Sequence, residues 1–73
     1  MYEQKYIVLG ARIAYYRKLA KLSQRQLSEK IAISTSHLSR IERGRYPNGV
    51  SLAILFAISD GLGIKVNQLF QDL

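Results

Sequence analysis

The chain has 73 residues, with no cysteine, no tryptophan, one proline and one histidine. Without cysteine it can form neither disulfides nor a thiolate metal site, and the lone histidine has no partners for one, so we expect no metal and no cofactor. No apolar run reaches the roughly 18 residues of a membrane span, and the first residues do not resemble a secretory signal. These absences favour a protein of the reducing cytoplasm with no membrane contact.

Acidic residues are also scarce, at five against eleven lysines and arginines, which gives a formal net charge of +6. The excess is uneven: residues 12–45 hold nine basic side chains and two acidic ones, whereas residues 46–73 hold one basic and two acidic. Clustered positive charge is typical of a surface that binds a polyanion. A basic surface that is merely solvated is the alternative.

The length of the chain limits its function. A domain of this size buries only about 60% of the surface that its unfolded chain exposes, so a deep catalytic cleft is not expected. The sequence has no glycine-rich phosphate loop, no paired-carboxylate signature and no cysteine nucleophile. We therefore predict that the protein is not an enzyme, and no small-molecule ligand is evident.

A short helix is predicted from Gln24 to about Ile31. Ser23 is followed three residues later by Gln26, which is the S-x-x-Q form of a capping box and indicates where the helix begins. Leu27 and Ile31 lie four residues apart and share one face, and polar side chains cover the rest of the helix. This helix is about two turns long.

A second short helix follows after a tight connector, from Thr35 to about Arg43, with Ser34 as its N-cap. Its apolar residues Leu38 and Ile41 lie three apart and should face inward. The glycine that follows Arg43 should end the helix in the left-handed conformation. The outward face is then left to hydroxyl-bearing and cationic side chains: Thr35, Ser36, Ser39, Arg40 and Arg43.

Three further helices complete an all-α prediction of five helices in one domain, residues 1–73. The first should span Ile7 to Ala20, the fourth should begin after Ser51, and a short last helix should hold Val66, Leu69 and Phe70. The inward-facing residues are expected to be Leu9, Ile13, Tyr16, Ala20, Leu27, Ile31, Ile33, Leu38, Ile41, Leu55, Ile58 and Leu62.

Two other segments carry local signals. Gly10 lies inside the first predicted helix and should weaken it by about 1 kcal/mol relative to alanine. Residues 45–50, Arg-Tyr-Pro-Asn-Gly-Val, contain the only proline and an Asn-Gly pair, which indicate a loop.

The second short helix has the polarity of a helix that reads DNA. The major groove admits one α-helix, and the N-terminal part of that helix points at the base edges. Thr35, Ser36 and Arg40 are therefore candidates for reading bases, and an arginine bound to guanine O6 and N7 contributes about 1–3 kcal/mol of discrimination. The alternatives are that Thr35 and Ser36 only cap the helix, and that Arg40 holds a phosphate or a surface ion pair.

These residues lie in a sequence that resembles the Cro and phage-repressor type of helix-turn-helix regulators, over roughly residues 9–70. LSQ at 22–24, IERGR at 41–45 and ISDGLGIKVNQLF at 58–70 are similar to recurrent signatures of that family. Ala32 departs from the pattern, since a turn glycine is usual there and a left-handed alanine is mildly strained. The resemblance implies a compact five-helix, repressor-like domain whose helix-turn-helix motif spans about residues 23–44, with base contacts at the three candidate positions.

Polar residues around the motif are candidates for phosphate contacts. The helix that begins at Gln24 has unpaired N–H groups and a positive dipole at its first turn, and the resemblance implies that this glutamine touches the DNA backbone. Arg43 and Arg45 flank the end of the reading helix and should hold phosphates, or else are idle surface charges. The weaker candidates are Ser34, His37 and Ser39.

The resemblance also implies one structural contact, an ion pair between Arg17 in the first helix and Glu42 at the end of the reading helix. If it forms, it fixes the reading helix against the first helix. Loss of one partner would cost more than the 0 to about 1 kcal/mol of an exposed pair only if the site is sheltered from water.

The predicted fourth helix is apolar around its whole circumference at residues 52–58, whereas a surface helix should show one polar face. Ala53, Ile54, Phe56 and Ala57 would form an apolar surface that is left over once the core is built. A homodimer is the natural occupant, because two-fold association places paired reading helices on half-sites about 34 Å apart. The alternative is tighter packing within the monomer, under Tyr2, Tyr6 and Tyr15.

The function predicted from these features is that of a sequence-specific transcriptional regulator, a repressor or controller, which binds a palindromic operator in double-stranded DNA as a homodimer. The alternative is a protein-interaction module, such as an antitoxin or an adaptor, whose apolar fourth helix grips a different protein. The basic residues around an exposed polar helix argue against that role as the only one.

Overall fold

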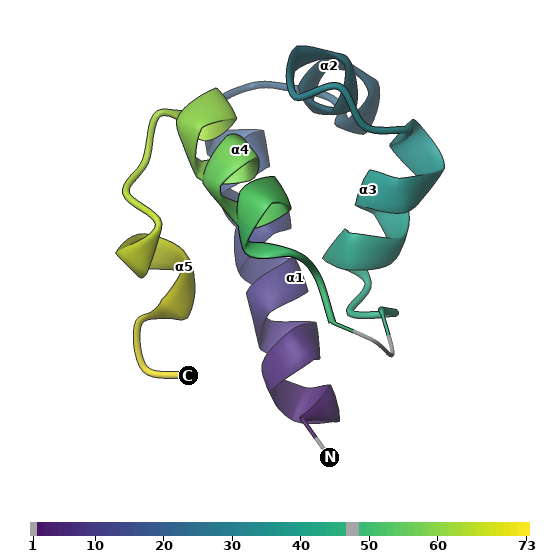
Figure 1. The fold of residues 1–73 in the computed structure, drawn as a ribbon. Helices are drawn as coiled ribbons and strands as arrows, with labels where there is room; N and C mark the ends of the chain where they lie inside the picture. Colours follow the sequence, from purple (N-terminus) through teal and green to yellow (C-terminus); the bar gives the residue numbers. More distant parts are fainter. Residues whose placement is uncertain (1, 47–48) are drawn as a thin grey trace.

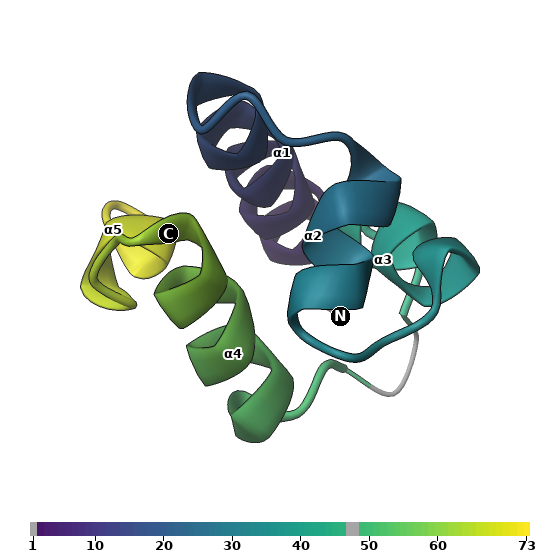
Figure 2. The same ribbon diagram turned by 90° about the horizontal axis from the view of Figure 1, so that it is seen from above.

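The computed structural model describes residues 2–46 and 49–73, and the regular secondary structure in them is helical throughout. Five helices follow one another: α1 Glu3–Leu19, α2 Gln24–Lys30, α3 Thr35–Glu42, α4 Leu52–Leu62 and α5 Asn67–Phe70. Helices α2 and α3 lie together on one side of α1, and α5 lies on the other (Figures 1 and 2). The predicted all-α, five-helix fold is confirmed. Among the described helices, none combines the length and apolar character needed to cross a bilayer.

Side-chain caps begin the three middle helices where the sequence predicted them. At the start of α2 the Gln26 N–H donates to Ser23 Oγ at 3.0 Å, and the Ser23 N–H donates to Gln26 Oε1 at 2.8 Å, so the capping box is complete. Ser34 Oγ accepts the N–H of His37 at the start of α3, and Ser51 Oγ accepts the N–H of Ile54 at the start of α4. Each cap satisfies a donor that the helix itself leaves unpaired.

Helix α1 differs from its prediction at both ends. It begins at Glu3 rather than Ile7, because residues 3–5 are good helix formers and Tyr6 packs against the core, which the apolar stripe alone did not show. It ends at Leu19, and Ala20 is an exposed C-cap rather than a core residue.

Each of the helices α1 to α4 is followed by a residue in the left-handed conformation: Lys21 (φ 60°), Ala32 (φ 61°), Gly44 (φ 72°) and Gly63 (φ 69°). The next N–H in the chain then bonds back to the helix, as from Arg45 N to Arg40 O at 2.9 Å and from Ile33 N to Ser28 O at 3.0 Å. The left-handed conformation expected for Ala32 is therefore present. Two of the four positions carry a Cβ and are mildly strained.

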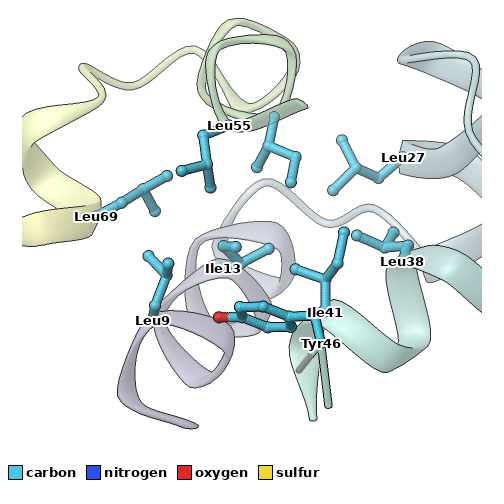
Figure 3. Close-up of a cluster of buried hydrophobic side chains, with 9 residues drawn as sticks. Leu9, Ile13, Leu27, Leu38, Ile41, Tyr46, Leu55 and Leu69 are labelled. Atoms are coloured by element: carbon cyan, nitrogen blue, oxygen red, sulfur yellow. The ribbon is translucent and has the colours of Figure 1, made fainter. Parts of the chain in front are cut away.

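The core lies where α1, α3 and α4 meet, with one residue each from α2 and α5 (Figure 3). Four of the residues predicted to face inward are only partly buried and pack around this centre: Tyr16, Ile31, Ile33 and Leu62. The buried hydrophobic residues are Leu9, Ile13, Leu27, Leu38, Ile41, Tyr46, Leu55, Ile58 and Leu69.

Two glycines let the backbone of α1 touch the end of α3. A Cβ on Gly10 would lie 2.3 Å from the carbonyl oxygen of Ile41 and 2.7 Å from that of Glu42. A Cβ on Gly44 would lie 2.8 Å from the Cα of Ile7. The sequence indicated Gly10 only as a weak point of its helix, whereas the structure shows that the missing side chain also permits this close crossing.

The predicted loop at 45–50 includes Pro47 and Asn48, which lie outside the described residues. Tyr46 is not a solvated loop residue: its ring packs at 4.8 Å from that of Tyr6, and its hydroxyl donates to the Tyr6 carbonyl at 2.9 Å. Burial, with a smaller contribution from Tyr6, raises the pKa of Tyr46 from 10.0 to about 12. This tyrosine joins the segment after α3 to α1.

Candidate nucleic-acid interface

The outer face of α3 carries the three residues that were predicted to read bases. Thr35, Ser36 and Arg40 are exposed, and we call them the reading face. Behind them Leu38 and Ile41 are completely buried in the core. The helix is therefore anchored on one side and open to solvent on the other, as a helix that enters a groove must be.

Helices α2 and α3 cross closely at Ser28, which is only 1% exposed. Its Oγ donates to the carbonyl of Arg25 at 2.9 Å and lies 3.0 Å from Oγ1 of Thr35. By contrast, the hydroxyl of Ser36 contacts another exposed hydroxyl, because its Oγ lies 3.3 Å from that of Ser34. The first residue of the reading face is thus tied to α2 through a buried hydroxyl, a contact that the sequence did not predict.

A second polar network fixes the other end of α3. Arg17 and Glu42, the pair implied by the family resemblance, bond at two points: Nε to Oε2 at 2.7 Å and Nη2 to Oε1 at 3.1 Å. Arg17 also donates to the Leu22 carbonyl at 2.8 Å. The two side chains are 11% and 5% exposed, so the pair is sheltered from water. It connects α1 directly to the last residue of α3.

Gln24, a predicted phosphate contact, joins this network. Its Nε2 donates to Glu42 Oε1 at 2.9 Å, so one of its two amide hydrogens is already used inside the protein. The side chain is half-buried at the start of α2. Only the second amide hydrogen and the backbone of the first turn remain to face DNA.

The nine basic residues of 12–45 do not all contribute to one binding surface. Arg17 is buried in its ion pair, and Arg12 donates to the carbonyls of Leu69 and Gln71 at the C-terminal segment. Arg12 was counted with the DNA-binding charge, and that expectation was wrong, because its guanidinium faces α5. Arg25 forms an exposed pair with Glu29 at 3.9 Å. The exposed cations that remain are Lys18, Lys21, Lys30, Arg40, Arg43 and Arg45.

The other predicted phosphate contacts surround the reading face. Arg43 and Arg45 are exposed just after α3. Like that of Arg40, their side chains have no hydrogen-bond or ion-pair partner among residues 2–46 and 49–73. Ser34 is exposed and caps α3, whereas His37 and Ser39 are half-buried along its flank. The arrangement is one polar helix face with free cations at its C-terminal end, which can hydrogen-bond base edges while charges hold phosphates.

A helix-turn-helix family model matches residues 13–69 of the chain. The chain belongs to the helix-turn-helix family. Members of this family are DNA-binding regulators rather than enzymes, as the sequence predicted.

Individual relatives agree with this assignment. The helix-turn-helix protein is 46% identical over 61 residues to an immunity repressor protein of Bacillus phage phi105, and the match covers 84% of this chain and 41% of that repressor. The chain therefore spans less than half of the phage protein's length.

Two solved helix-turn-helix structures share the fold. The restriction-modification controller protein C.AhdI from Aeromonas hydrophila superposes with a TM-score of 0.84 at 28% identity, over 89% of this chain and 96% of that one. The biofilm master regulator SinR, solved in complex with DNA, superposes with a TM-score of 0.79 at 36% identity, over 86% and 98%.

The helix-turn-helix protein also has an exposed apolar surface on α4. Leu52 is 63% and Phe56 is 50% exposed, whereas Ile54 is partly buried and packs against the core. Of the tyrosines that could have covered this helix, Tyr6 packs on Tyr46, Tyr15 packs edge-on to Tyr16 at 5.2 Å, and Tyr2 is 54% exposed. We call Leu52 together with the predicted residues Ala53, Ile54, Phe56 and Ala57 the α4 face.

Proposed function

We propose that this helix-turn-helix protein is a cytoplasmic, sequence-specific transcriptional regulator that binds a palindromic operator as a homodimer, without a cofactor. The observation that carries the proposal is the exposed polar face of α3, which is held rigidly from behind by buried leucine and isoleucine and by the Arg17–Glu42 pair. A helix that only built the core would not need such a face. The likeness to a phage immunity repressor and to a regulator solved with DNA supports the same function.

In this proposal the reading face enters the major groove. Thr35 and Ser36 contact base edges from the first turn of α3, and Arg40 donates two parallel hydrogen bonds to a guanine. Their exposure, and the absence of any ion-pair partner of Arg40 among the described residues, support these roles. The residues proposed to hold phosphates are Gln24, Ser34, His37, Ser39, Arg43 and Arg45.

The α4 face supports the proposed homodimer. Large apolar side chains that stay exposed on a small protein mark an interaction surface when they are contiguous, and Leu52 and Phe56 lie one turn apart on the same helix. Two-fold pairing buries the same surface on both subunits and sets two copies of α3 about 34 Å apart on one side of the duplex. Palindromic operators follow from this symmetry.

Selection of binding sites from random duplexes tests the proposal as a whole. We expect a recovered motif with two inverted half-sites whose centres are about one helical turn apart. If about three cations per subunit neutralise phosphates, the slope of log affinity against log salt concentration should be near −5 for the dimer. A slope near zero, or recovery of no motif, would contradict DNA binding as the function.

The division between residues that read bases and residues that hold phosphates has its own test. Arg40→Ala should flatten the preference among operator variants, by about 1–3 kcal/mol at one base pair. Arg45→Ala should weaken binding to every sequence alike and reduce the salt slope by about 1. Identical behaviour of the two variants in competition binding would contradict this division.

The α4 face also suits a different protein as its partner, which is the second candidate function, an antitoxin or adaptor. The exposed Leu52 and Phe56 would form the contacts with that partner. It predicts co-purification of a partner in a stoichiometric complex together with no preference among duplexes. The homodimeric regulator predicts that no other protein co-purifies in a stoichiometric complex and that the protein prefers some duplexes over others.

A further inference from the structure

The hydroxyl of Ser28 lies between a carbonyl and the reading face. Its Oγ is 2.9 Å from the Arg25 carbonyl oxygen and 3.0 Å from Thr35 Oγ1, and Ser28 is only 1% exposed. A carbonyl oxygen can only accept a hydrogen bond, whereas each hydroxyl has a single hydrogen to donate. The direction of the bond between the two side chains therefore follows from a count of hydrogens.

Both contacts form together only in one arrangement. Ser28 donates its hydrogen to the Arg25 carbonyl, so it can only accept from Thr35, and Thr35 must use its own hydrogen for that bond. If the middle bond ran the other way, the buried serine would lose its bond to the carbonyl, which is unfavourable where water cannot replace it. Thr35 is left with outward lone pairs and its methyl group.

We propose that Ser28 is a positioning residue that sets the base preference of Thr35, by making its hydroxyl an acceptor toward DNA. This inference rests on the proposed function. An acceptor in the major groove matches the exocyclic amino groups, adenine N6 and cytosine N4, whereas guanine O6 and thymine O4 are acceptors themselves. Ser28 does not touch the base and acts only through Thr35.

The same restriction does not apply to the rest of the reading face. Ser36 contacts Ser34, but both are exposed, so water can replace either partner and the hydroxyl of Ser36 can turn to suit the base. Gln24, at the start of α2, directs its amide to Glu42 rather than to Thr35. Ser28 is thus the buried side chain that bonds to the reading face among the described residues.

A base that offers an acceptor to Thr35 costs one of these hydrogen bonds. Either Thr35 gives up its bond to Ser28, or Ser28 turns to donate to Thr35 and gives up its bond to the Arg25 carbonyl. Otherwise the base stays unpaired. The net value of one neutral hydrogen bond corresponds to roughly a 2- to 10-fold change in relative affinity. The preference for an amino-bearing base over an acceptor-bearing base at that position should be of this size. It should be confined to one base pair in each half-site.

The test uses the full chain with Ser28→Ala, Thr35→Val and the double variant, and Ser36→Ala as the matched exposed control. Each is titrated by competition against duplexes that carry all four base pairs at each position of the selected site. Ser28→Ala frees the Thr35 hydrogen, while the Arg25 carbonyl keeps its place in the hydrogen-bond ladder of α2. Thermal unfolding checks that each variant folds.

We expect wild type to favour an amino-bearing base at one position, Ser28→Ala to relax that preference about 2- to 10-fold, and every other position to be unchanged. Ser28→Ala should have no further effect in the Thr35→Val background. A merely structural role for Ser28 would instead lower affinity for all duplexes equally.

Two results would overturn the inference and leave the proposed function intact. One is a base profile of Ser28→Ala that matches wild type at the position that Thr35→Val alters, and the other is a Thr35→Val variant with an unaltered profile. If wild-type protein shows no base preference at any position, the proposed function fails, and this inference fails with it.

Discussion

The side of the molecule that holds α3 differs from the side formed by α4 in the kind of contact that fixes it. Helix α3 is tied to α1 and α2 by directional polar bonds, the Arg17–Glu42 pair and the Ser28–Thr35 contact, and by a glycine that lets the backbones meet. Helix α4 packs through apolar side chains such as Leu55 and Ile58 and leaves Phe56 exposed.

The roles proposed for the two sides make different demands on the contacts that fix them. Hydrogen bonds weaken steeply when donor and acceptor are misaligned, and closely touching backbones leave little room to rotate, so both fix the angle between two helices. Apolar burial is non-directional and mainly keeps the helices close together. A helix that presents side chains to a groove needs its angle defined. A face that pairs with a copy of itself needs exposed apolar area instead.

The largest expected effect follows from cutting the sheltered ion pair. Glu42→Ala leaves the Arg17 guanidinium, whose side chain is 11% exposed, without its carboxylate. Removal of one partner of a buried pair costs about 3–5 kcal/mol of unfolding free energy, because a charge stays buried and unpaired. Urea unfolding of the two proteins measures this difference.

The exposed pair Arg25–Glu29, 3.9 Å apart, supplies the matched control. Arg25→Ala should lower stability by less than about 0.5 kcal/mol, since both partners are solvated. Equal urea midpoints for Glu42→Ala and Arg25→Ala would show that shelter from water adds nothing to the contribution of the Arg17–Glu42 pair to stability. Replacement of both partners by apolar residues, Arg17→Met with Glu42→Leu, should recover much of the lost stability.

The second effect concerns the α4 face. Phe56→Lys replaces a side chain that is 50% exposed, so the fold should lose less than about 0.5 kcal/mol. In the proposed dimer, however, it places two charges in an apolar contact. Operator affinity should then fall about 100-fold or more, because each half-site is bound separately once the subunits are no longer joined.

A charge-matched control separates loss of pairing from a general change in charge. Tyr15→Lys adds the same charge at a residue of α1 that is 58% exposed and lies outside the α4 face. It should leave the sedimentation mass and the operator affinity close to those of wild type. If Phe56→Lys sediments with the same mass as wild type, the assignment of this face to the dimer is wrong.

The third effect tests the close crossing of α1 and α3. An alanine Cβ at position 10 would meet the Ile41 carbonyl oxygen at 2.3 Å, and two backbones cannot yield as a side chain can. Gly10→Ala should therefore destabilise by about 1–3 kcal/mol, despite the better helix propensity of alanine. Thermal unfolding provides the measurement.

Gly61→Ala is the control from the α4 side. There a Cβ would meet the Ile31 Cγ2 atom at 2.8 Å and the Leu27 Cδ1 atom at 3.3 Å, both at the ends of side chains that can shift. The gain in helix propensity, about 1 kcal/mol, offsets part of the clash. A Gly61→Ala variant that unfolds as early as Gly10→Ala would contradict the contrast between backbone and side-chain contacts.

Local signals in the sequence predicted most of the fold. The caps at Ser23, Ser34 and Ser51 depend on partners three residues away, so a short stretch of sequence contains the information they need. The stripe of Leu38 and Ile41 likewise predicted which side of α3 is buried, and therefore which side is open.

Contacts between distant segments could not be predicted in the same way. Nothing around Gly10 indicates that the end of α3 lies against it, and nothing around Arg12 indicates that it bonds to carbonyls at the C-terminal segment. The exposure of Thr35 could be predicted from its position on α3, opposite the apolar stripe. Its bond to Ser28 could not, because that bond depends on how closely α2 and α3 cross. The roles proposed at DNA remain predictions.

The smallest effect concerns Tyr46, which joins the segment after α3 to α1. Its pKa of about 12 in the folded protein exceeds the ordinary value of 10.0, because burial disfavours the phenolate. Since the folded pKa is the higher one, the neutral hydroxyl contributes stability that is fully present below pH 10 and is lost as pH rises toward about 12. Tyr46→Phe keeps the ring but cannot donate to the Tyr6 carbonyl.

We expect Tyr46→Phe to be less stable than wild type by about 0.5–1.5 kcal/mol near neutral pH, the net value of one hydrogen bond. The gap should narrow above pH 10, where wild type alone loses the contribution of this hydroxyl. Urea unfolding across this range measures the gap, and the difference in tyrosinate absorbance between the two proteins isolates the titration of Tyr46. A gap that stays constant through pH 12 would mean that folding does not raise the pKa of Tyr46. The absence of any gap near neutral pH would mean that ring packing alone maintains the tie between α1 and the end of α3.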